Sequence, residues 1–578
     1  MEVIRLRRGV VLRSAWKMGR GYFFSESKKE AWLLLLIVIS LNLFLVYITV
    51  ELNIWQGNFY QVLQLKDHRG FLEAIAIYAG LAIILIVVKG AQTYFRLLLQ
   101  INWRRWLTKE YLRRWLDRKS YYRLQFVHKD YADNPDQRIS EDVDLFVSLT
   151  LRLSLDCLHD MITVISFVVI LWNLSGLLVV AIFGYTFMIQ GYMVWAAFIY
   201  AIFGTYFTVK FGKPLIQLDY DKQKYEADFR YSLIRVREYS ESIALYGGEL
   251  AEEKNCLAHF SYLVRNFRQI IQVRKQLTWL TTAYAHIAVV FAVAAASPRY
   301  FAGKIQLGQL FQITDAFYHV QNGLSFIIDS FTKVAHWRAV VNRLNGFLVS
   351  MEELDIKMIS SSRGECKIGS DIHLSQVSIY KPDKIVLIKG LKLHLPKSKS
   401  LIVTGASGCG KSTLVKTLAG LWKNYDGNVS IPNPRESLFV PQKPYMPIDT
   451  LRNALFYPDI KRKITDEEIG SLLEKCCLPS FKNRLNEFGD WGKILSLGEQ
   501  QRIAFVRILI HQPKWLFLDE ATSALDEVNQ EIMYGLVKKF LPDTAIISVG
   551  HRQSIMRYHQ LCLNIEKDTS WSLKAVKI

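Results

Sequence analysis

The stretch Gly405-Ala406-Ser407-Gly408-Cys409-Gly410-Lys411-Ser412-Thr413 decides the fold of the second half of this chain. It fits the pattern GxxxxGK[ST] and stands between an apolar run, 401–404, and a helix-forming run, 412–421. Glycines let backbone N–H groups approach phosphate oxygens, and the N-terminus of a helix favours the same negative charge. The sequence therefore predicts a strand, loop and helix that bind nucleotide phosphates, with Lys411 reaching the β- and γ-phosphates and Ser412 ligating Mg²⁺.

A second apolar strand farther along the chain, Trp515-Leu516-Phe517-Leu518, ends in the acidic pair Asp519-Glu520. The carboxyl ends of parallel strands meet at one edge of a sheet, so this pair is expected beside the phosphate loop. We predict that Asp519 holds Mg²⁺ and that Glu520 positions or activates the attacking water.

More motifs occur in order around these two. They are Tyr380 upstream of the loop, Val440-Pro441-Gln442, Leu495-Ser496-Leu497-Gly498-Glu499-Gln500-Gln501-Arg502, Ser523-Ala524-Leu525-Asp526 and Gly550-His551-Arg552. From about residue 365 to the end, the set resembles the ATPases of ABC transporters. The resemblance implies that Tyr380 stacks on adenine, that Gln442 ligates Mg²⁺, and that Gln442 and His551 sense the γ-phosphate. It also implies that Mg²⁺ and ATP lie between the phosphate loop of one subunit and the signature of another.

The signature motif departs from the family's common LSGGQ form at two positions. Leu497 replaces a glycine and Glu499 replaces a glutamine, whereas Ser496 and Gly498 are kept. The helix N-terminus that meets the γ-phosphate is therefore expected to persist, with Ser496, Gly498 and Glu499 at the partner's nucleotide. The placement of the Glu499 carboxylate, and with it the strength of the contact between subunits, stays open.

The first half of the chain is apolar enough to cross a membrane. Hydrophobic residues make up 51% of the sequence, the mean hydropathy is +0.12, and a span needs about 20 mostly apolar residues. Six spans are expected: Ala31–Val50, Phe71–Val88, Met161–Leu174, Gly191–Val209, Thr278–Ser297 and a more polar one, Leu307–Phe331. We expect the apolar stretch Leu177–Ile189 to be an outer loop or a helix extension.

The basic residues show which side of the membrane each connection faces. They gather in the N-terminal segment and after the second, fourth and sixth spans, for example at Arg96–Arg123, Lys210–Lys224 and Lys333–Arg343. This is the positive-inside pattern for a chain with both ends in the cytoplasm. It accounts for much of the net charge of +20 without a nucleic-acid partner, and we exclude one.

The same pattern divides the chain into four parts. Residues 1–30 are expected to be a basic segment on the lipid surface, 31–345 the transmembrane domain, 346–365 a linker and 366–578 the nucleotide-binding domain. Two cytoplasmic connections, Arg96–Leu155 and Lys210–Gln276, are too long for turns, so the helices are expected to continue below the membrane. Seven cysteines without a CxxC pair indicate reduced thiols.

Several polar residues fall within the predicted spans. They are His286 in the fifth span and Asp315, His319, Gln321, Asn322 and Asp329 in the sixth. Ionisable groups at bilayer depth are costly and usually face a bundle interior or a wet cavity. For Asp315 and Asp329, a hydrophilic solute path stands beside the alternative of an interfacial position or pairing between helices.

The membrane half resembles a particular branch of the family. Asn134-Pro135-Asp136-Gln137-Arg138-Ile139 is similar to a motif of the subfamily D (peroxisomal fatty-acyl) transporters. Tyr192–Ala197, Glu226–Arg230 and Glu241–Glu249 resemble bacterial SbmA/BacA-related transporters that carry their own ATPase. This implies the exporter-type (type IV) six-helix fold, with uptake of hydrophilic compounds such as cobalamin, bleomycin and antimicrobial peptides. We expect the segments around Asp136 and Tyr246 to couple the two domains, although ordinary helix caps and packing would give similar sequences.

The fold class expected is thus a membrane all-α six-helix domain fused to an α/β P-loop ABC ATPase domain. One ATPase and six spans are half of a transporter, so a homodimer in a bacterial inner membrane is expected, with a heterodimer left open. The leading function is ATP-driven transport, by expectation uptake, of hydrophilic or peptide-like solutes. An exporter or fatty-acyl transporter, and an ATP-gated channel or regulatory ATPase, are the alternatives.

Overall fold

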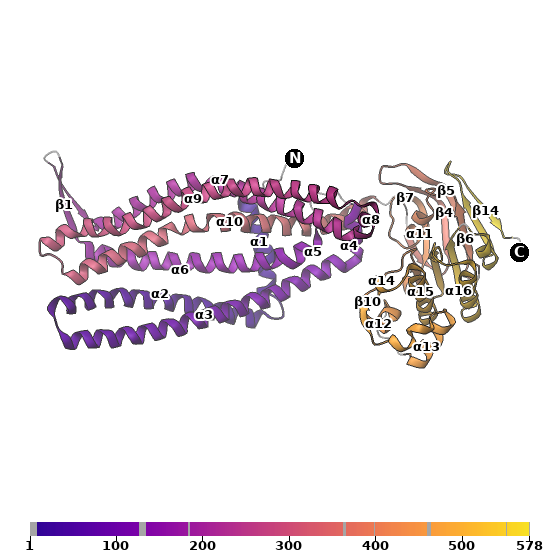
Figure 1. Cartoon of the computed structure of the whole chain (residues 1–578), viewed down its shortest axis with the longest axis horizontal. Helices are drawn as coiled ribbons and strands as arrows, with labels where there is room; N and C mark the ends of the chain where they lie inside the picture. Colours follow the sequence, from indigo (N-terminus) through magenta and orange to yellow (C-terminus); the bar gives the residue numbers. More distant parts are fainter. Residues whose placement is uncertain are drawn as a thin grey trace. The chain divides into compact units, whose positions relative to one another are not determined.

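The structure is a computed structural model that describes residues 8–126, 134–182, 185–361, 364, 366–397, 399–458, 464–550 and 552–576. They fall into two compact units, Met1–Met351 and Glu352–Ile578. The first unit is helical and the second is α/β, as predicted (Figure 1).

Long helices build the first unit because each apolar span runs directly into charged helix formers. They are α1 (Arg8–Phe23), α2 (Lys28–Leu65), α3 (His68–Leu116), α6 (Val143–Ser175), α7 (Tyr192–Glu238), α9 (Glu249–Phe301) and α10 (Leu307–Ser361). Helices α2 and α3 lie side by side, as do α7 and α9 (Figure 1). The apolar faces of α6, α7, α9 and α10 meet in one core that includes Phe167, Met193, Ala292 and Phe317.

Five stretches in the described part of the chain are long and apolar enough to cross a membrane: α2, α3, Pro135–Ser175, α7 and α9. They carry the first five predicted spans. The sixth predicted span lies in α10, which does not meet the same criterion among the described residues. Asp315 and His319, one helical turn apart, are among the polar residues that lower its hydropathy.

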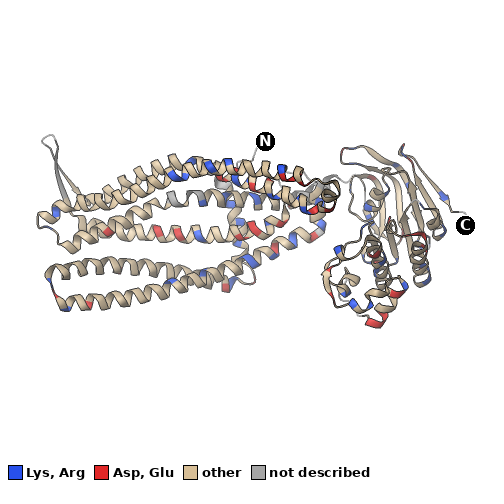
Figure 2. Cartoon of the chain, viewed as in Figure 1, with Lys and Arg blue, Asp and Glu red and all other residues tan. Residues whose placement is uncertain are grey.

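The predicted extensions below the membrane are helical. Helix α3 continues to Leu116, α7 to Glu238, and α9 starts at Glu249. Short helices α4 (Ser120–Arg123), α5 (Pro135–Gln137) and α8 (Ser240–Tyr246) lie at this end of the unit, where the coloured charges gather (Figures 1 and 2). The opposite end shows few charges, which fits the expected polarity across the membrane.

The basic N-terminal segment is more than a surface helix. One face of α1 buries Val11, Ala15, Met18 and Tyr22. Tyr22 stacks on Trp103 of α3 with ring centroids 6.1 Å apart. The opposite face exposes Leu12 and Trp16. The helix is therefore amphipathic, with one face packed on the bundle and apolar side chains left on the other.

One expectation for the first unit is wrong in part. The stretch Leu177–Ile189 does not extend a helix, because it forms an antiparallel pair of strands, β1 (Leu177–Ile182) and β2 (Tyr185–Gln190). β-branched and aromatic residues dominate these strands, and both types favour extended backbone. The segment therefore connects α6 to α7, in line with the other alternative, an outer loop.

The predicted linker, 346–365, is mostly helical. Helix α10 continues through it to Ser361, so the helix passes the boundary between the two compact units at Met351. Small and charged residues there suggested a flexible linker, but serine, glutamate and lysine are tolerated on the polar surface of a helix.

The second unit contains two main sheets. Its six-stranded sheet has the order β14-β13-β6-β12-β11-β8, and its four-stranded sheet the order β3-β7-β4-β5. The larger sheet contains β6 (Leu401–Gly405), β8 (Ser437–Val440), β11 (Trp515–Asp519), β12 (Ala545–Val549), β13 (Leu561–Ile565) and β14 (Trp571–Ala575); the smaller contains β3 (Cys366–Gly369), β4 (Ile372–Tyr380), β5 (Val386–Leu395) and β7 (Tyr425–Pro432). Strands β13, β6, β12, β11 and β8 run parallel, so their carboxyl ends share one edge.

Helices pack around these sheets. They are α11 (Lys411–Leu418), α12 (Leu451–Phe456), α13 (Asp466–Lys475), α14 (Trp491–Ile494), α15 (Leu497–His511) and α16 (Glu527–Phe540). A core of fully buried residues such as Trp491, Phe505 and Leu516 joins the helices to the larger sheet. This core fixes the strand ends, and with them the predicted nucleotide site.

Candidate functional site

The phosphate loop joins β6 to α11, as its sequence predicted. Gly405, Gly408 and Gly410 have φ angles of +141°, +81° and +104°, a region that favours glycine. A Cβ on Gly405 would lie 2.2 Å from the Ile565 carbonyl oxygen, so no other residue fits there. Lys411 Nζ donates to the carbonyl oxygens of Gly405 (2.8 Å) and Ala406 (2.9 Å), and the ammonium is thereby held over its own loop.

The rest of the loop presents three kinds of side chain. Ser407 is exposed, Cys409 is buried beneath the loop, and Thr413 is half-buried. The buried Cys409 packs with the core of the β4–β5 sheet, which anchors the middle of the loop. The backbone N–H groups of such a loop form the concave site that binds phosphates.

Two predicted metal ligands meet at the shared strand edge. The Ser412 hydroxyl donates to Asp519 Oδ1 over 3.0 Å. Burial raises the pKa of Asp519 above its usual value, while the Ser412 hydrogen bond and nearby Lys416 and Lys411 oppose the shift. A hydroxyl and a carboxylate are hard oxygen ligands, and Mg²⁺ bound with a nucleotide needs only one or two of them from the protein. This donor set therefore fits Mg²⁺.

The predicted water-activating residue lies next to this pair. Glu520 has a φ angle of +49°, which is rare for a residue with a side chain, and its N–H donates to the Val549 carbonyl oxygen. Gln442 Nε2 donates to Glu520 Oε2 over 3.1 Å. The structure thus brings Gln442, Glu520, Asp519 and Ser412 to one edge of the sheet. His551 lies outside the described residues.

The adenine-stacking candidate is held at the end of β4. The Tyr380 hydroxyl donates to Asp426 Oδ2 over 3.0 Å, and Trp422 Nε1 donates to the Tyr380 carbonyl oxygen over 3.0 Å. Sequence reasoning did not identify Trp422 or Asp426. Both follow the phosphate-loop helix in the chain, and their contacts fix the orientation of the Tyr380 ring.

The signature segment, at the start of α15, fixes where the Glu499 side chain lies. Ser496 caps the N-terminus of α15, and Glu499 Oε2 accepts from the Ser496 N–H (2.9 Å) and hydroxyl (2.8 Å). The pair is a capping box, so the carboxylate turns back onto its own helix start. Gly498 lies close to the Ala524 carbonyl oxygen, which a Cβ would approach to 3.3 Å.

A fully buried glutamine that sequence reasoning missed connects three of the motifs. Gln501 Nε2 donates to the Gln442 carbonyl oxygen (2.9 Å) and to Ser523 Oγ (3.2 Å). Its Oε1 accepts from the Ala524 N–H over 3.0 Å. The signature helix is therefore bonded directly to Gln442 and to the Ser523–Ala524 segment that follows Glu520. Only its place inside a motif could have indicated this residue.

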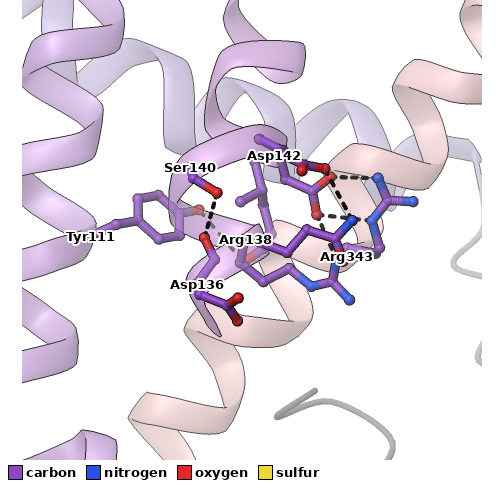
Figure 3. Close-up of polar contacts among 9 residues, drawn as sticks. Tyr111, Asp136, Arg138, Ser140, Asp142 and Arg343 are labelled. Atoms are coloured by element: carbon purple, nitrogen blue, oxygen red, sulfur yellow. Dashed lines mark hydrogen bonds and ion pairs between the residues drawn. The ribbon is translucent and has the colours of Figure 1, made fainter. Parts of the chain in front are cut away.

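The first unit has a polar cluster of its own, beside the predicted coupling segment. Asp142 ends a π-helical turn, Arg138–Asp142, and its side chain is 3% exposed. Arg343 of α10 donates to both carboxylate oxygens, at 2.9 and 2.5 Å, and Arg138 donates to Oδ2 at 2.8 Å. Figure 3 shows both guanidinium groups pointing at this carboxylate, with Ser140 on the same turn and Asp136 on α5 directly before it. The cluster connects the Asn134–Ile139 motif to α10.

The other coupling candidate, Tyr246, is strongly exposed at the end of α8, as is Leu245 beside it. Of the polar residues in the predicted spans, Asp315 lines a cavity and His286 is exposed. The Asp329 side chain lies outside the described residues. The structure thus places Asp315 at a cavity and His286 away from it.

Comparisons with known proteins agree with this geometry. Residues 18–301 match the family model "ABC transporter transmembrane region 2" and residues 388–523 the model "ABC transporter". The chain is 32% identical to the Escherichia coli "Inner membrane ABC transporter ATP-binding protein YddA", covering 92% of this chain and 94% of that protein. It is 27% identical to the human "Lysosomal cobalamin transporter ABCD4", covering 96% and 95%.

A solved structure titled "Structure of a bacterial Atm1-family ABC exporter with ATP bound" shares the fold. Its TM-score is 0.71 at 16% identity, over 96% of each chain. The exporter-like arrangement of helices and ATPase predicted from the sequence is therefore confirmed at the level of the fold.

Proposed function

The chain belongs to the ABC transporter family, and from that premise we propose that it carries hydrophilic or peptide-like solutes into the cytoplasm across a bacterial inner membrane as a homodimer. Its ATPase domain binds ATP and is coupled to transport across the membrane. As a half-transporter it requires a second transmembrane and ATPase set. What we add is that the second set comes from another copy of this chain, that the solute is hydrophilic or peptide-like, and that transport is inward.

One observation carries the choice of solute: the sixth predicted span presents a carboxylate to a cavity. Asp315 lines that cavity together with Thr314 of the same helix and Gln56 of α2. Intramembrane ionisable groups that face cavities usually mark the path of a polar substrate. The similarity to a protein named as a cobalamin transporter supports a polar solute, and the similarity to YddA supports an inner-membrane location.

In the proposed cycle, the Gly405–Thr413 loop of one copy and the Ser496–Gly498 signature of the other enclose ATP. Ser412, Asp519 and Gln442 would hold Mg²⁺, which would neutralise charge on the phosphate oxygens. Lys411 leaves its loop carbonyls for the phosphates. Water attacks the γ-phosphorus, the bond to the ADP oxygen breaks, and Glu520 accepts the proton from the water.

Contacts within the ATPase domain connect the phosphate site to the signature helix. Gln442 bonds to Glu520 through its side chain and to Gln501 through its carbonyl oxygen. A change at the phosphate site thus moves the Gln442 segment and the signature helix together. We expect the segments around Asp136 and Tyr246 to receive this movement, with Asp142 transmitting it to α10.

Solute uptake in cells tests the proposal. Cells with the wild-type chain are expected to accumulate labelled cobalamin and to become more sensitive to bleomycin. Cells with Glu520→Gln are expected to do neither, because hydrolysis stops. Glu527→Gln removes an exposed carboxylate nearby in α16 and serves as the matched control. Uptake that is equal in wild type and Glu520→Gln, or lower solute content with the active chain, contradicts ATP-driven import.

Export remains the alternative direction, because the fold shared with the Atm1-family exporter does not set the direction of transport. Lower bleomycin content in wild-type cells than in Glu520→Gln cells would select export.

A further inference from the structure

The cavity beside α10 combines an acidic side chain with aromatic walls. It has a volume of about 190 Å³ and is lined by residues of α2, α9 and α10: Gln56, Ala288, Val289, Phe311, Thr314, Asp315, Phe317 and Tyr318. This volume is smaller than the roughly 300–1,000 Å³ of a site for a whole small molecule. It suits one functional group of a larger solute.

A buried amide holds the Asp315 side chain at the cavity. Asn53, which is 1% exposed, donates from Nδ2 to Asp315 Oδ2 (2.7 Å) and to the Gln312 carbonyl oxygen (3.2 Å). A carboxylate oxygen and a backbone carbonyl oxygen both accept hydrogen bonds, so the amide nitrogen of Asn53 faces them. Asn53 itself does not line the cavity, and its bond fixes the position of the Asp315 carboxylate, which does.

The charge of Asp315 is weakly compensated. His319 Nε2 lies 3.6 Å from Asp315 Oδ2, too far for a good hydrogen bond, and its ring stacks on Phe167 with centroids 4.2 Å apart. In the part of the chain that the structure describes, no lysine or arginine lies within 4.0 Å of this carboxylate. The low-dielectric surroundings make an unpaired carboxylate costly and a cationic partner favourable.

The aromatic walls favour the same kind of ligand. Phe311, Phe317 and Tyr318 line the cavity, and Phe311 is fixed by stacking on Tyr60 with centroids 4.1 Å apart. The faces of aromatic rings attract ammonium and guanidinium groups, most strongly where water is excluded. A carboxylate and aromatic rings are together the chemistry that recognises an organic cation.

The depth of the cavity fits capture from outside. Asn53 follows the first predicted span, 31–50, and Asp315 lies two turns from the outer start of α10 at Leu307. Both are therefore at the outer end of the membrane under the positive-inside topology.

We propose that this cavity captures a primary ammonium or guanidinium group of the transported solute, with Asp315 as its counter-ion. The proposal rests on the transport function proposed above and narrows its solute class to hydrophilic molecules that carry an amine or guanidine. Gln56 contributes an oxygen acceptor, and Phe311 and Phe317 cover the apolar sides of the group.

Two matched probes test this proposal on the full-length chain in nanodiscs. They are fluorescent tripeptides that differ only by a lysine in place of Nε-acetyllysine. The wild-type chain is expected to bind the lysine peptide at least about tenfold more tightly than the acetylated one, since a tenfold change equals about 1.4 kcal/mol. Asp315→Asn, which keeps the shape of the side chain, is expected to remove this preference. Glu73→Gln, which removes an exposed carboxylate at the outer end of α3, is expected to retain it.

A second variant keeps the proposal testable if Asp315→Asn fails to fold. Gln56→Lys adds a resident ammonium to the cavity without touching the Asn53–Asp315 bond, and it is expected to abolish lysine-peptide binding. Equal binding of the two peptides by the wild type, binding of neither, or a preference that survives Asp315→Asn overturns the proposal. Failure of the underlying transport function is distinct, because it would show as bleomycin sensitivity that does not depend on Glu520.

Discussion

Replacing Asp142 with asparagine tests the link between the coupling segment and α10. The Asp142 side chain is 3% exposed and bonds to Arg138 and Arg343, whose side chains are 14% and 31% exposed. Removing the charge leaves two guanidinium groups facing an amide, and breaking a buried ion pair at one partner costs about 3–5 kcal/mol. Because Arg343 is partly open to solvent, we expect the lower end of this range, about 3 kcal/mol.

Thermal unfolding of the first unit measures this cost. An unfolding entropy of about 2.1 cal/mol/K per residue gives roughly 0.7 kcal/mol/K for a unit of this size, so Tm is expected to fall by about 4 °C. The matched control is Asp144→Asn, two residues away. Asp144 and Arg104 form a pair at 3.3 Å with side chains 37% and 38% exposed, and such a pair is worth about 0–1 kcal/mol.

The same variant carries a functional readout. If Asp142 transmits movement from the Asn134–Ile139 motif to α10, the amount of solute moved per ATP hydrolysed falls in Asp142→Asn and stays unchanged in Asp144→Asn. Equal Tm values for the two variants, or a coupling ratio as high as that of the wild type, would refute the reasoning.

Three further predictions concern the ATPase domain. Burial raises the pKa of Asp519, so its ionised form destabilises the nucleotide-free fold. Asp519→Asn is therefore expected to raise the Tm measured without nucleotide and to lose the increase in Tm that Mg·ATP causes in the wild type. Calorimetry with and without Mg·ATP checks both results. Burial lowers the pKa of His559 from 6.5 to about 4, and the unfolded chain therefore takes up its proton first as the pH falls. The free energy of unfolding is therefore expected to fall by up to about 3 kcal/mol between pH 6.5 and pH 4, as urea titrations at each pH would show. His559→Gln is expected to make the free energy of unfolding depend less on pH over this range. Gln501→Ala, which breaks the bonds to Gln442 and Ala524, is expected to lower the rate of ATP hydrolysis at least about tenfold with ATP affinity nearly unchanged, as steady-state kinetics would show; unchanged turnover would contradict its positioning role.

The phosphate loop and the acidic strand end could be predicted from sequence because each motif is short and sits at the end of a buried strand. Parallel strands then bring Ser412 and Asp519 together although 107 residues separate them. The α/β topology determines which strand ends lie together, so the local sequence pattern needs only to identify each strand and helix.

Contacts between distant helices could not be predicted in this way. Asp142 and Arg343 are 201 residues apart, and nothing in either local pattern indicates the pairing. The strands Leu177–Ile182 and Tyr185–Gln190 were also ambiguous, because a short apolar run fits a strand or a helix extension equally well. The capping role of Glu499 depended on the start of α15, and helix boundaries are the least certain feature of a sequence-based prediction.

Directional transport in proteoliposomes tests the central claim most directly. Vesicles are loaded with labelled bleomycin, and Mg·ATP is added outside, where it reaches only the chains whose ATPase domains face outward. Import toward the ATPase side predicts that the wild-type chain empties the vesicles of label, and that Glu520→Gln leaves the label inside. Loss of label without ATP, equal loss with Glu520→Gln, or ATP-driven accumulation of external label in the lumen would contradict the account.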